Sequence, residues 1–98
     1  MHKLVVHYSE PNYPAHFRKY YVETHVPLAD KLPGLRASRY SFDAKVLGPG
    51  KAPFCVFEAE FESEAALMAA LKSPEGRAVA ADVPNYASGG VTMLHYPA

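Results

Sequence analysis

The order of strand-like and helix-like segments limits what this chain can fold into more than any other feature of its sequence. Short runs rich in β-branched and aromatic residues alternate with stretches of helical periodicity. Strands are expected over 3–8, 35–46, 54–62 and 91–96, and helices over 14–33, 65–71 and 73–83. This βαββαβ order, with the last two helices taken as one region, predicts a ferredoxin-like α+β fold. The 98 residues suit one domain, spanning 1–98.

Caps and turns support these boundaries. Ser63 is expected to cap one helix, and Ser73 followed by Pro74 is expected to start the next. Gly48-Pro49-Gly50 and Pro53 predict a hairpin loop between the second and third strands. The first helix is expected to stop at Pro33-Gly34.

Three of the expected strands carry apolar residues on both faces. Leu4–Val6 is a continuous apolar run, Phe54 and Phe57 lie on opposite faces, and so do the two residues of Met93–Leu94. An antiparallel sheet with helices on one face alone would show a polar second face. Since no further helix is available, the pattern predicts a homodimer in which two sheets pack face to face.

His25 lies on the apolar stripe of the first expected helix. The stripe recurs at spacings of three and four residues and consists of Phe17, Tyr21, His25, Leu28 and Leu32. Pro27 falls inside the stripe and is expected to kink or break the helix near His25. A half-buried imidazole there can act as a general acid or base, because its pKa lies near neutral pH. It can equally be a core histidine that is hydrogen-bonded to a freed carbonyl, and both interpretations stay open.

Four tyrosines gather around this helix: Tyr8, Tyr13, Tyr20 and Tyr21. They can form an aromatic pocket with hydroxyl tips for a small ligand, or they can be ordinary core and surface rings. Tyr20 and Tyr21 lie about 100° apart around a helix, so the sequence leaves open which of them faces inward.

The other histidines form no metal-binding motif. His2, His7, His16 and His95 lack the H-x-x-x-H and H-E-x-x-H spacings. His7 and His95 are expected to meet if the first and last strands pair, but two histidines make an incomplete metal site. No metal is therefore expected. Asp82 is interpreted as a helix-end cap, with a ligand-binding role as the alternative.

Charge and cysteine content exclude several classes of partner. The 10 Lys and Arg residues balance 10 Asp and Glu residues, whereas nucleic acids and anionic membranes require a basic surface. No apolar run approaches the roughly 20 residues of a membrane span, and no signal peptide is expected. Cys55, the single cysteine, is expected to be a buried core residue of a cytoplasmic protein.

Three stretches resemble the EthD family, small proteins named for a component of bacterial ethyl tert-butyl ether degradation. The most specific stretch is Phe17–Leu35, in which His-Val-Pro-Leu is followed by Leu-Pro-Gly. Phe61–Leu67 and Ser73–Tyr86 extend the resemblance over nearly the whole chain. The resemblance implies a dimeric α/β barrel of two ferredoxin-like subunits, and the motif histidine of the family corresponds to His25.

Similar dimeric α/β barrels include isomerases, dehydratases, polyketide cyclases and cofactor-independent monooxygenases. The resemblance therefore implies a small hydrophobic metabolite, from degradation or secondary metabolism, between helices and sheet. We expect His25 to move a proton without a cofactor, and Tyr20 or Tyr8 to hold a carbonyl or hydroxyl group. Ligand contacts are expected from Tyr8, Tyr21, Leu28, Phe57, Phe61, Met68 and Tyr86.

Two alternatives remain beside the enzyme hypothesis. The chain can be a non-catalytic accessory protein that holds a small molecule for a partner oxygenase. It can also be a structural homodimer whose aromatic rings fill the core and leave no ligand cavity.

Overall fold

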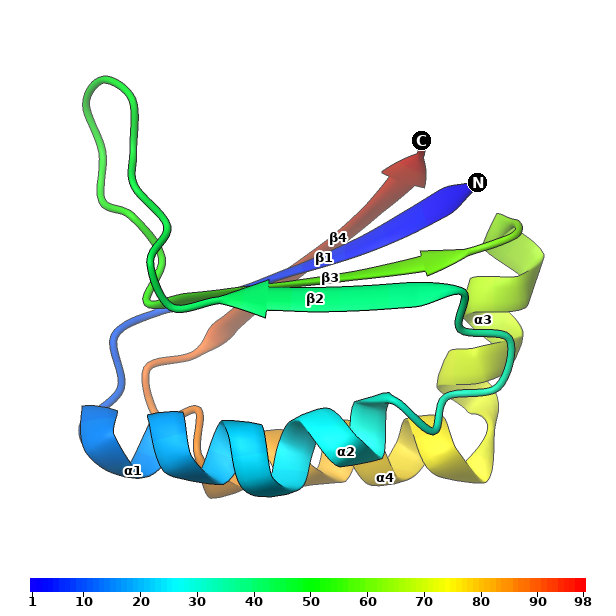
Figure 1. Ribbon diagram of the computed structural model, residues 1–98, viewed down its shortest axis with the longest axis horizontal. Helices are drawn as coiled ribbons and strands as arrows, with labels where there is room; N and C mark the ends of the chain where they lie inside the picture. The colour runs from blue at the N-terminus through cyan, green and yellow to red at the C-terminus, as the bar shows by residue number, and fades with distance from the viewer.

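One antiparallel sheet and one layer of helices make up the fold (Figure 1). The structure is a computed structural model that describes residues 1–98. The strands are β1 (His2–Tyr8), β2 (Ala37–Ser41), β3 (Cys55–Phe61) and β4 (Val91–Pro97), in the sheet order β2-β3-β1-β4. The helices are α1 (Pro14–Tyr20), α2 (Val26–Ala29), α3 (Glu64–Lys72) and α4 (Pro74–Asp82). The predicted ferredoxin-like α+β fold is confirmed.

Alternation along the central strands builds the core. On β3, Cys55, Phe57, Ala59 and Phe61 are buried, while the residues between them are half-buried. β1 pairs antiparallel with β3, so that Val6 lies opposite Phe57 and Tyr8 lies opposite Cys55. These side chains face the helices and form one contiguous cluster with Phe17 of α1.

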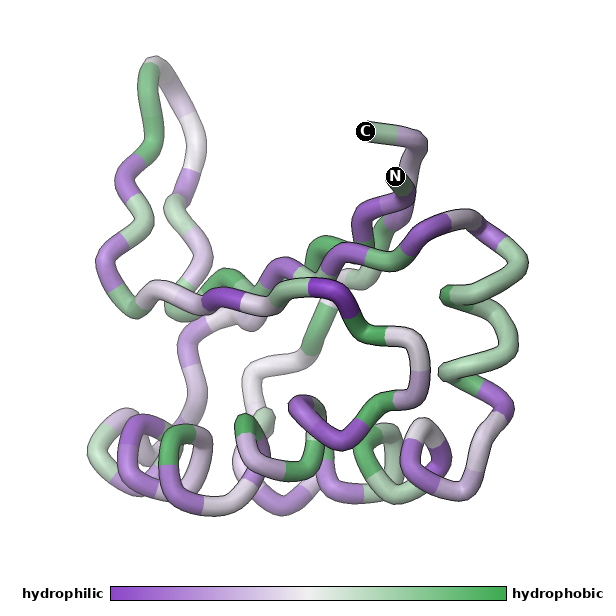
Figure 2. The backbone as a smooth tube through the Cα atoms, turned by 45° about the vertical axis from the view of Figure 1, so that its right-hand side comes forward, coloured by the Kyte–Doolittle hydropathy of each residue, from purple (hydrophilic) through white to green (hydrophobic).

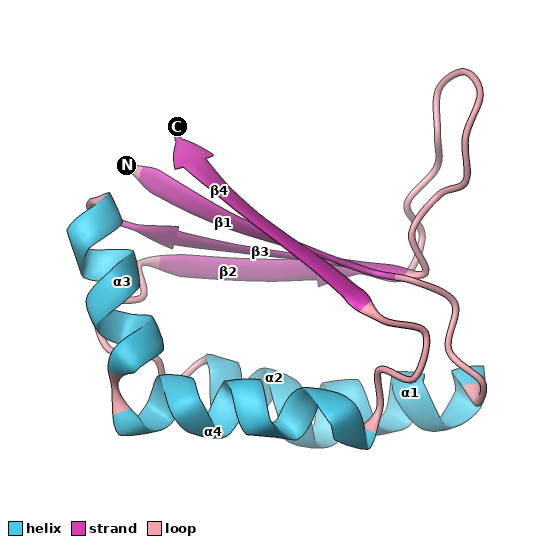
Figure 3. Cartoon of the chain, turned by 180° about the vertical axis from the view of Figure 1, so that it is seen from behind, coloured by secondary structure: helices cyan, strands magenta, loops and turns pink.

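No element of the chain covers the second face of the sheet (Figure 3). By the pairing register, this face carries Val5 of β1 and Leu94 of β4 beside an ion pair of 3.1 Å between Lys3 Nζ and Glu58 Oε1. The loop between β2 and β3 rises on this side and has a hydrophobic stretch near its tip (Figure 2). The Leu47 side chain in this loop is fully exposed.

The predicted caps are present. Ser63 Oγ accepts a hydrogen bond from the Ala66 N–H at the start of α3. Ser73 Oγ accepts one from the Gly76 N–H, and Pro74 occupies the first helical position of α4. None of the helices is both long enough and apolar enough to cross a lipid bilayer.

The second strand is much shorter than the expected 35–46. β2 ends at Ser41, which pairs with Val56, and the chain leaves the sheet there. The partner strand β3 begins at Cys55, one residue beyond the Val56 that faces Ser41, so it offers almost no further backbone to pair with. Continued in the same register, the ladder would set Pro53, which has no backbone N–H, opposite Ala44, and it could not have reached Val46. Phe42, expected to lie on a strand face, instead packs from the loop against Phe17 and Phe54.

Candidate functional site

A π-helical segment, Tyr21–His25, joins α1 to α2 and carries His25 at its end. The Val26 N–H donates to the Tyr21 carbonyl, five residues back, which widens this turn relative to an α-helix. Pro27 follows at the start of α2, where a missing N–H disturbs the helical pattern least. The distortion lies where Pro27 predicted it, but the helix widens and continues where a kink or break was expected. Such π-helical turns are frequent at functional sites.

The widened turn also changes which residues face the core. Tyr21, His25 and Ala29 are buried at steps of four residues, whereas Leu28 is half-exposed. In an α-helix, residues four positions apart differ by about 40° in direction around the helix axis. The wider π-helical turn reduces this difference, so residues at steps of four stay on the same face. The expected place of Leu28 on the stripe was therefore wrong, and Ala29 takes it. The helix ends at Ala29, four residues before Pro33, and turns lead to the buried Leu32.

Asp82 and His25 form a buried pair between two helices. The pair joins His25 Nδ1 and Asp82 Oδ2 at 2.9 Å. A carboxylate accepts hydrogen bonds, so His25 carries its proton on Nδ1 and leaves the Nε2 lone pair free. Asp82 Oδ1 accepts from the Tyr20 hydroxyl at 2.6 Å and from Asn85 Nδ2 at 3.0 Å. Three side chains from two helical regions thus hold one carboxylate in place.

The surroundings favour a neutral imidazole beside an ionised carboxylate. Burial lowers the pKa of His25 below 6.5, and the hydrogen bond and charge of Asp82 only partly oppose this. Burial alone would raise the pKa of Asp82, but the hydrogen bonds from Tyr20, Asn85 and His25 together hold it below 3.8. At neutral pH, His25 is therefore a neutral imidazole whose Nε2 can act as a base, and the Asp82 carboxylate orients its ring.

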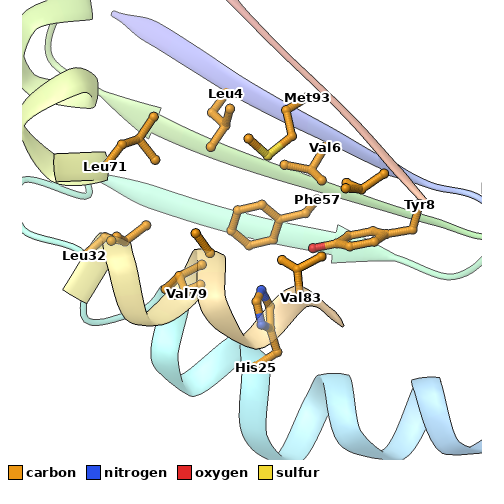
Figure 4. Close-up of a pocket in the computed structure, with 14 residues that line it drawn as sticks. Leu4, Val6, Tyr8, His25, Leu32, Phe57, Leu71, Val79, Val83 and Met93 are labelled. Carbon is orange, nitrogen blue, oxygen red and sulfur yellow. The ribbon is translucent and has the colours of Figure 1, made fainter. Parts of the chain in front are cut away.

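His25 borders an apolar cavity between the sheet and the helices (Figure 4). The cavity has a volume of about 70 Å³. Its walls are apolar except for His25 and Tyr8, and include Leu4, Val6, Leu32, Phe57, Leu71 and Val79. In Figure 4, the His25 ring rises from the helix layer towards side chains that descend from the sheet. His25 Nε2 has no hydrogen-bond partner within the chain, so it is available to a bound molecule.

A tyrosine pair provides the second polar group of the cavity. The hydroxyl oxygens of Tyr8 and Tyr86 lie 2.9 Å apart, and the Tyr86 ring packs on His25 with ring centroids 4.7 Å apart. Burial raises the pKa of both phenols, so they remain neutral donors. Tyr21 is fully buried beside them, and its hydroxyl lacks a hydrogen-bond partner. Of this group, Tyr8 borders the cavity.

The other expected ligand contacts are distributed unevenly around the cavity. Phe57 lines it, whereas Phe61 and Met68 lie outside it. Phe61 pairs with His2 and Phe57 with Val6, which places Phe61 about 13 Å further along the strand. Tyr20 also lies outside the cavity, because its hydroxyl is committed to Asp82.

The histidine pair on the sheet differs from the expected one. β1 and β4 pair as expected, but the register sets His7 opposite Thr92. His95 instead meets His2, and their ring nitrogens Nε2 and Nδ1 lie 2.8 Å apart. The expected contact between His7 and His95 was wrong because the two side chains lie on opposite faces of the sheet. His7 lies on the uncovered side of β1 and His95 on the helix side of β4. No cluster of three or more metal-ligating side chains is present.

Asp82 was interpreted as a helix-end cap, with a ligand-binding role as the alternative, and the sequence reasoning did not connect it with His25. A signal was present, since Asp82 follows Val79 by three residues and precedes Tyr86 by four, and His25 likewise lies at steps of three and four on its own apolar stripe. An acidic residue on an apolar stripe requires a partner. The sequence did not identify that partner as a histidine 57 positions earlier.

The fold and the site define a ferredoxin-like protein with a histidine–aspartate pair at a small apolar cavity. The EthD domain matches residues 10–90, and the chain belongs to this family. An uncharacterised 11.0 kDa protein from the thcB–thcC intergenic region of Rhodococcus erythropolis is 37% identical over 94 residues, which cover 96% of this chain and 91% of that protein.

Solved structures show the same fold. An EthD family protein from Bacillus halodurans has a TM-score of 0.86 at 26% identity, covering 100% of this chain and 98% of its own. A dimeric ferredoxin-like protein of unknown function from Thermobifida fusca has a TM-score of 0.75 at 13% identity, covering 99% and 90%. SnoaB, a cofactor-independent oxygenase from Streptomyces nogalater, has a TM-score of 0.66 at 18% identity, covering 99% and 91%.

Proposed function

We propose that this chain, as a single EthD-like domain over residues 1–98, is a cofactor-independent enzyme that acts on a small hydrophobic metabolite by proton transfer. The observation that carries the proposal is the 2.9 Å pair of His25 Nδ1 and Asp82 Oδ2 beside an apolar cavity. Burial keeps the imidazole neutral, and the carboxylate stabilises the imidazolium that forms when Nε2 takes a proton. Ether degradation is one source of such metabolites.

The chemistry follows from the two polar groups of the cavity. A carbonyl oxygen accepts a hydrogen bond from the Tyr8 hydroxyl, which the Tyr86 hydroxyl orients. His25 Nε2 removes a proton from the carbon beside that carbonyl and leaves an enolate. The proton returns to a different atom in an isomerisation, and loss of a leaving group or ring closure gives a dehydratase or cyclase. In the monooxygenase type, the enolate carbon would bond to molecular oxygen and the imidazolium would return the proton, which gives a hydroperoxide. Breakage of its O–O bond with loss of water would leave one oxygen atom in a new carbonyl group.

Deuterium exchange tests the proton transfer before the natural reaction is known. Small ketones and lactones are incubated with the protein in D₂O, and loss of the protons beside the carbonyl is followed by ¹H NMR. We expect exchange that falls roughly 100-fold or more in His25→Asn, because positioned general bases contribute about 10²–10⁴-fold. Asn places a nitrogen near the Nδ1 position and keeps a donor to Asp82, but it removes Nε2.

His16→Asn is the matched control, since this histidine is exposed on α1 and lies outside the cavity. It should exchange substrate protons at the parental rate. Equal exchange in His25→Asn and the parent would contradict the role of His25. Binding is measured separately from turnover by thermal shift with a panel of small aromatics, lactones and polyketide mimics. A compound that binds the folded protein raises its melting temperature whether or not it reacts.

A binding protein without catalysis is the second candidate, and it uses the same cavity. The observation in its favour is that Asp82 already satisfies His25 Nδ1, so a ligand needs only to donate a hydrogen bond to Nε2. In this role the chain would hold a small molecule for a partner oxygenase. Ligand binding lost in His25→Asn, together with absent exchange in the parent, would favour it over the enzyme.

We further propose that two copies pack through the uncovered face of the sheet, in the cytoplasm, where the buried Cys55 thiol stays reduced. Leu94 and Tyr96, each 40% exposed, and the fully exposed Leu47 supply apolar surface on that side. The Thermobifida fusca protein is described as dimeric and supports this assembly. Sedimentation at micromolar concentration should give a dimer, and a monomer would contradict the proposal.

A further inference from the structure

The cavity opens between β4 and α4. β4 is the edge of the sheet and packs extensively against β1 alone. Its residues Val91 and Met93 lie opposite Tyr8 and Val6, on the face that looks towards the helices. They nevertheless remain 39% and 57% exposed, whereas Tyr8 and Val6 are almost fully buried. The helix layer therefore ends short of β4 and leaves the underside of this strand open.

The opening is continuous with the space beside His25. Val91 and Met93 border the same cavity as His25, as do Val79 of α4 and Val83 of the 3-10 turn that follows α4. Figure 4 shows Met93 reaching towards the cavity from β4, and Val83 beside the upper end of the His25 ring. Each of these four side chains is apolar. A molecule whose polar end lies at His25 and Tyr8 would therefore leave the cavity along a hydrocarbon surface.

We propose that this mouth, formed by Val79, Val83, Val91 and Met93, binds the apolar tail of the ligand, with Met93 as the specificity-determining residue. This inference rests on the proposed function and names its substrate class, a carbonyl compound that carries a hydrocarbon tail. A cavity of about 70 Å³ accommodates only the reacting end of such a molecule. The unbranched thioether side chain of Met93 adapts its shape to different tails.

The position of the mouth argues for a ligand tail over a second copy of the chain as its occupant. The mouth lies on the helix side of the sheet, whereas the apolar surface assigned to the dimer lies on the other side. It joins directly to the one apolar cavity that holds an uncommitted imidazole nitrogen. Its lining carries no charge that would match a polar or ionic partner.

Affinity along a series of straight methyl ketones, from 2-butanone to 2-nonanone, tests the tail site. Dissociation constants are measured by ligand-observed NMR on the full chain. We expect each added methylene to lower the dissociation constant about two- to four-fold until the tail extends beyond the mouth. Complete burial of one methylene group corresponds to a factor of about four in the dissociation constant. Met93→Glu should abolish this increase, because a hydrocarbon tail gains nothing from lying against a charged carboxylate.

Thr92→Glu is the matched control, since Thr92 is the preceding residue of β4, is exposed, lies on the opposite face and is not among the apolar residues assigned to the dimer. It should retain the full increase with tail length. Ketones that bind and exchange protons through His25 without any dependence on tail length would overturn the tail site and leave the proposed function standing. Absence of all ketone binding would overturn both. A Met93→Glu variant that converts a dimer to a monomer would assign the mouth to the second copy.

Discussion

Gly76→Ala should destabilise the protein by roughly 1–3 kcal/mol, as is typical when a methyl group is forced into a packed site. An added Cβ at this position would overlap the Ala70 carbonyl oxygen and lie 2.6 Å from that of Leu71. These atoms belong to the backbone of α3 and cannot move aside as a flexible side chain would. Gly76 is buried where α3 and α4 meet, and its N–H donates to the Ser73 cap.

Helix propensity alone predicts the opposite sign, since Ala is favoured over Gly by about 1 kcal/mol in a helix. Ala78→Gly, at an exposed position of the same helix, is the control and should cost about that amount. Urea unfolding of both variants measures the two free energies. A Gly76→Ala variant as stable as the parent would show that the helices separate easily and that their close contact is unimportant.

Asp82→Asn should destabilise the protein at pH 7.5 by about 1–3 kcal/mol and increase its sensitivity to acid. The neutral amide cannot replace the charged acceptor of hydrogen bonds from His25 and Tyr20. The pKa of His25 is already below its unfolded value of 6.5 because of burial, and Asp82 is the group that raises it. Without this carboxylate, the pKa of His25 falls further.

The sign of the pH effect follows from proton linkage. The pKa of His25 is lower in the folded protein than in the unfolded chain, so on acidification the unfolded chain binds the proton first. The free energy of unfolding is therefore fully retained above pH 6.5 and decreases as the pH falls below that value. The lowered pKa of Asp82 acts in the same direction below pH 3.8 in the parent. Urea unfolding at pH 7.5, 6.5 and 5.5 should show a steeper loss in Asp82→Asn than in the parent.

His25→Asn completes this comparison because it removes the titrating ring. Its stability should vary less between pH 7.5 and 5.5 than that of the parent. The remaining four histidines are common to all three proteins and cancel in the differences. An acid-induced loss in His25→Asn as large as in the parent would mean that His25 does not titrate with the fold.

Local patterns predicted most of the fold. Alternation placed Cys55 and Phe57 on the buried face of β3, and hydroxyl caps placed the starts of α3 and α4. Strand 35–46 was overestimated because its end depends on where the partner strand offers hydrogen bonds. β3 begins only at Cys55, next to the Val56 that pairs with Ser41, and β2 stops there. An alternating segment does not by itself carry that information.

The candidate site was predictable only in part. His25 stood out as an ionisable ring on an apolar stripe beside Pro27, and the structure buries it there. Asp82 contacts it from the end of α4, and the Tyr86 ring packs on it from beyond that helix, at separations that no local pattern encodes. Ala29, and not the expected Leu28, is the buried residue of the stripe, and this too depended on the width of one helical turn.

The sequence by itself determined the order of strands and helices, their caps and the apolar faces, because hydrogen bonding and side-chain periodicity act over a few residues. The tertiary structure decided the partner of His25, the register that joins His2 to His95, and the open underside of β4. These features depend on how two layers are placed against each other. That placement is set by packing across the whole chain, where a shift of one residue in a strand or one turn in a helix changes every contact.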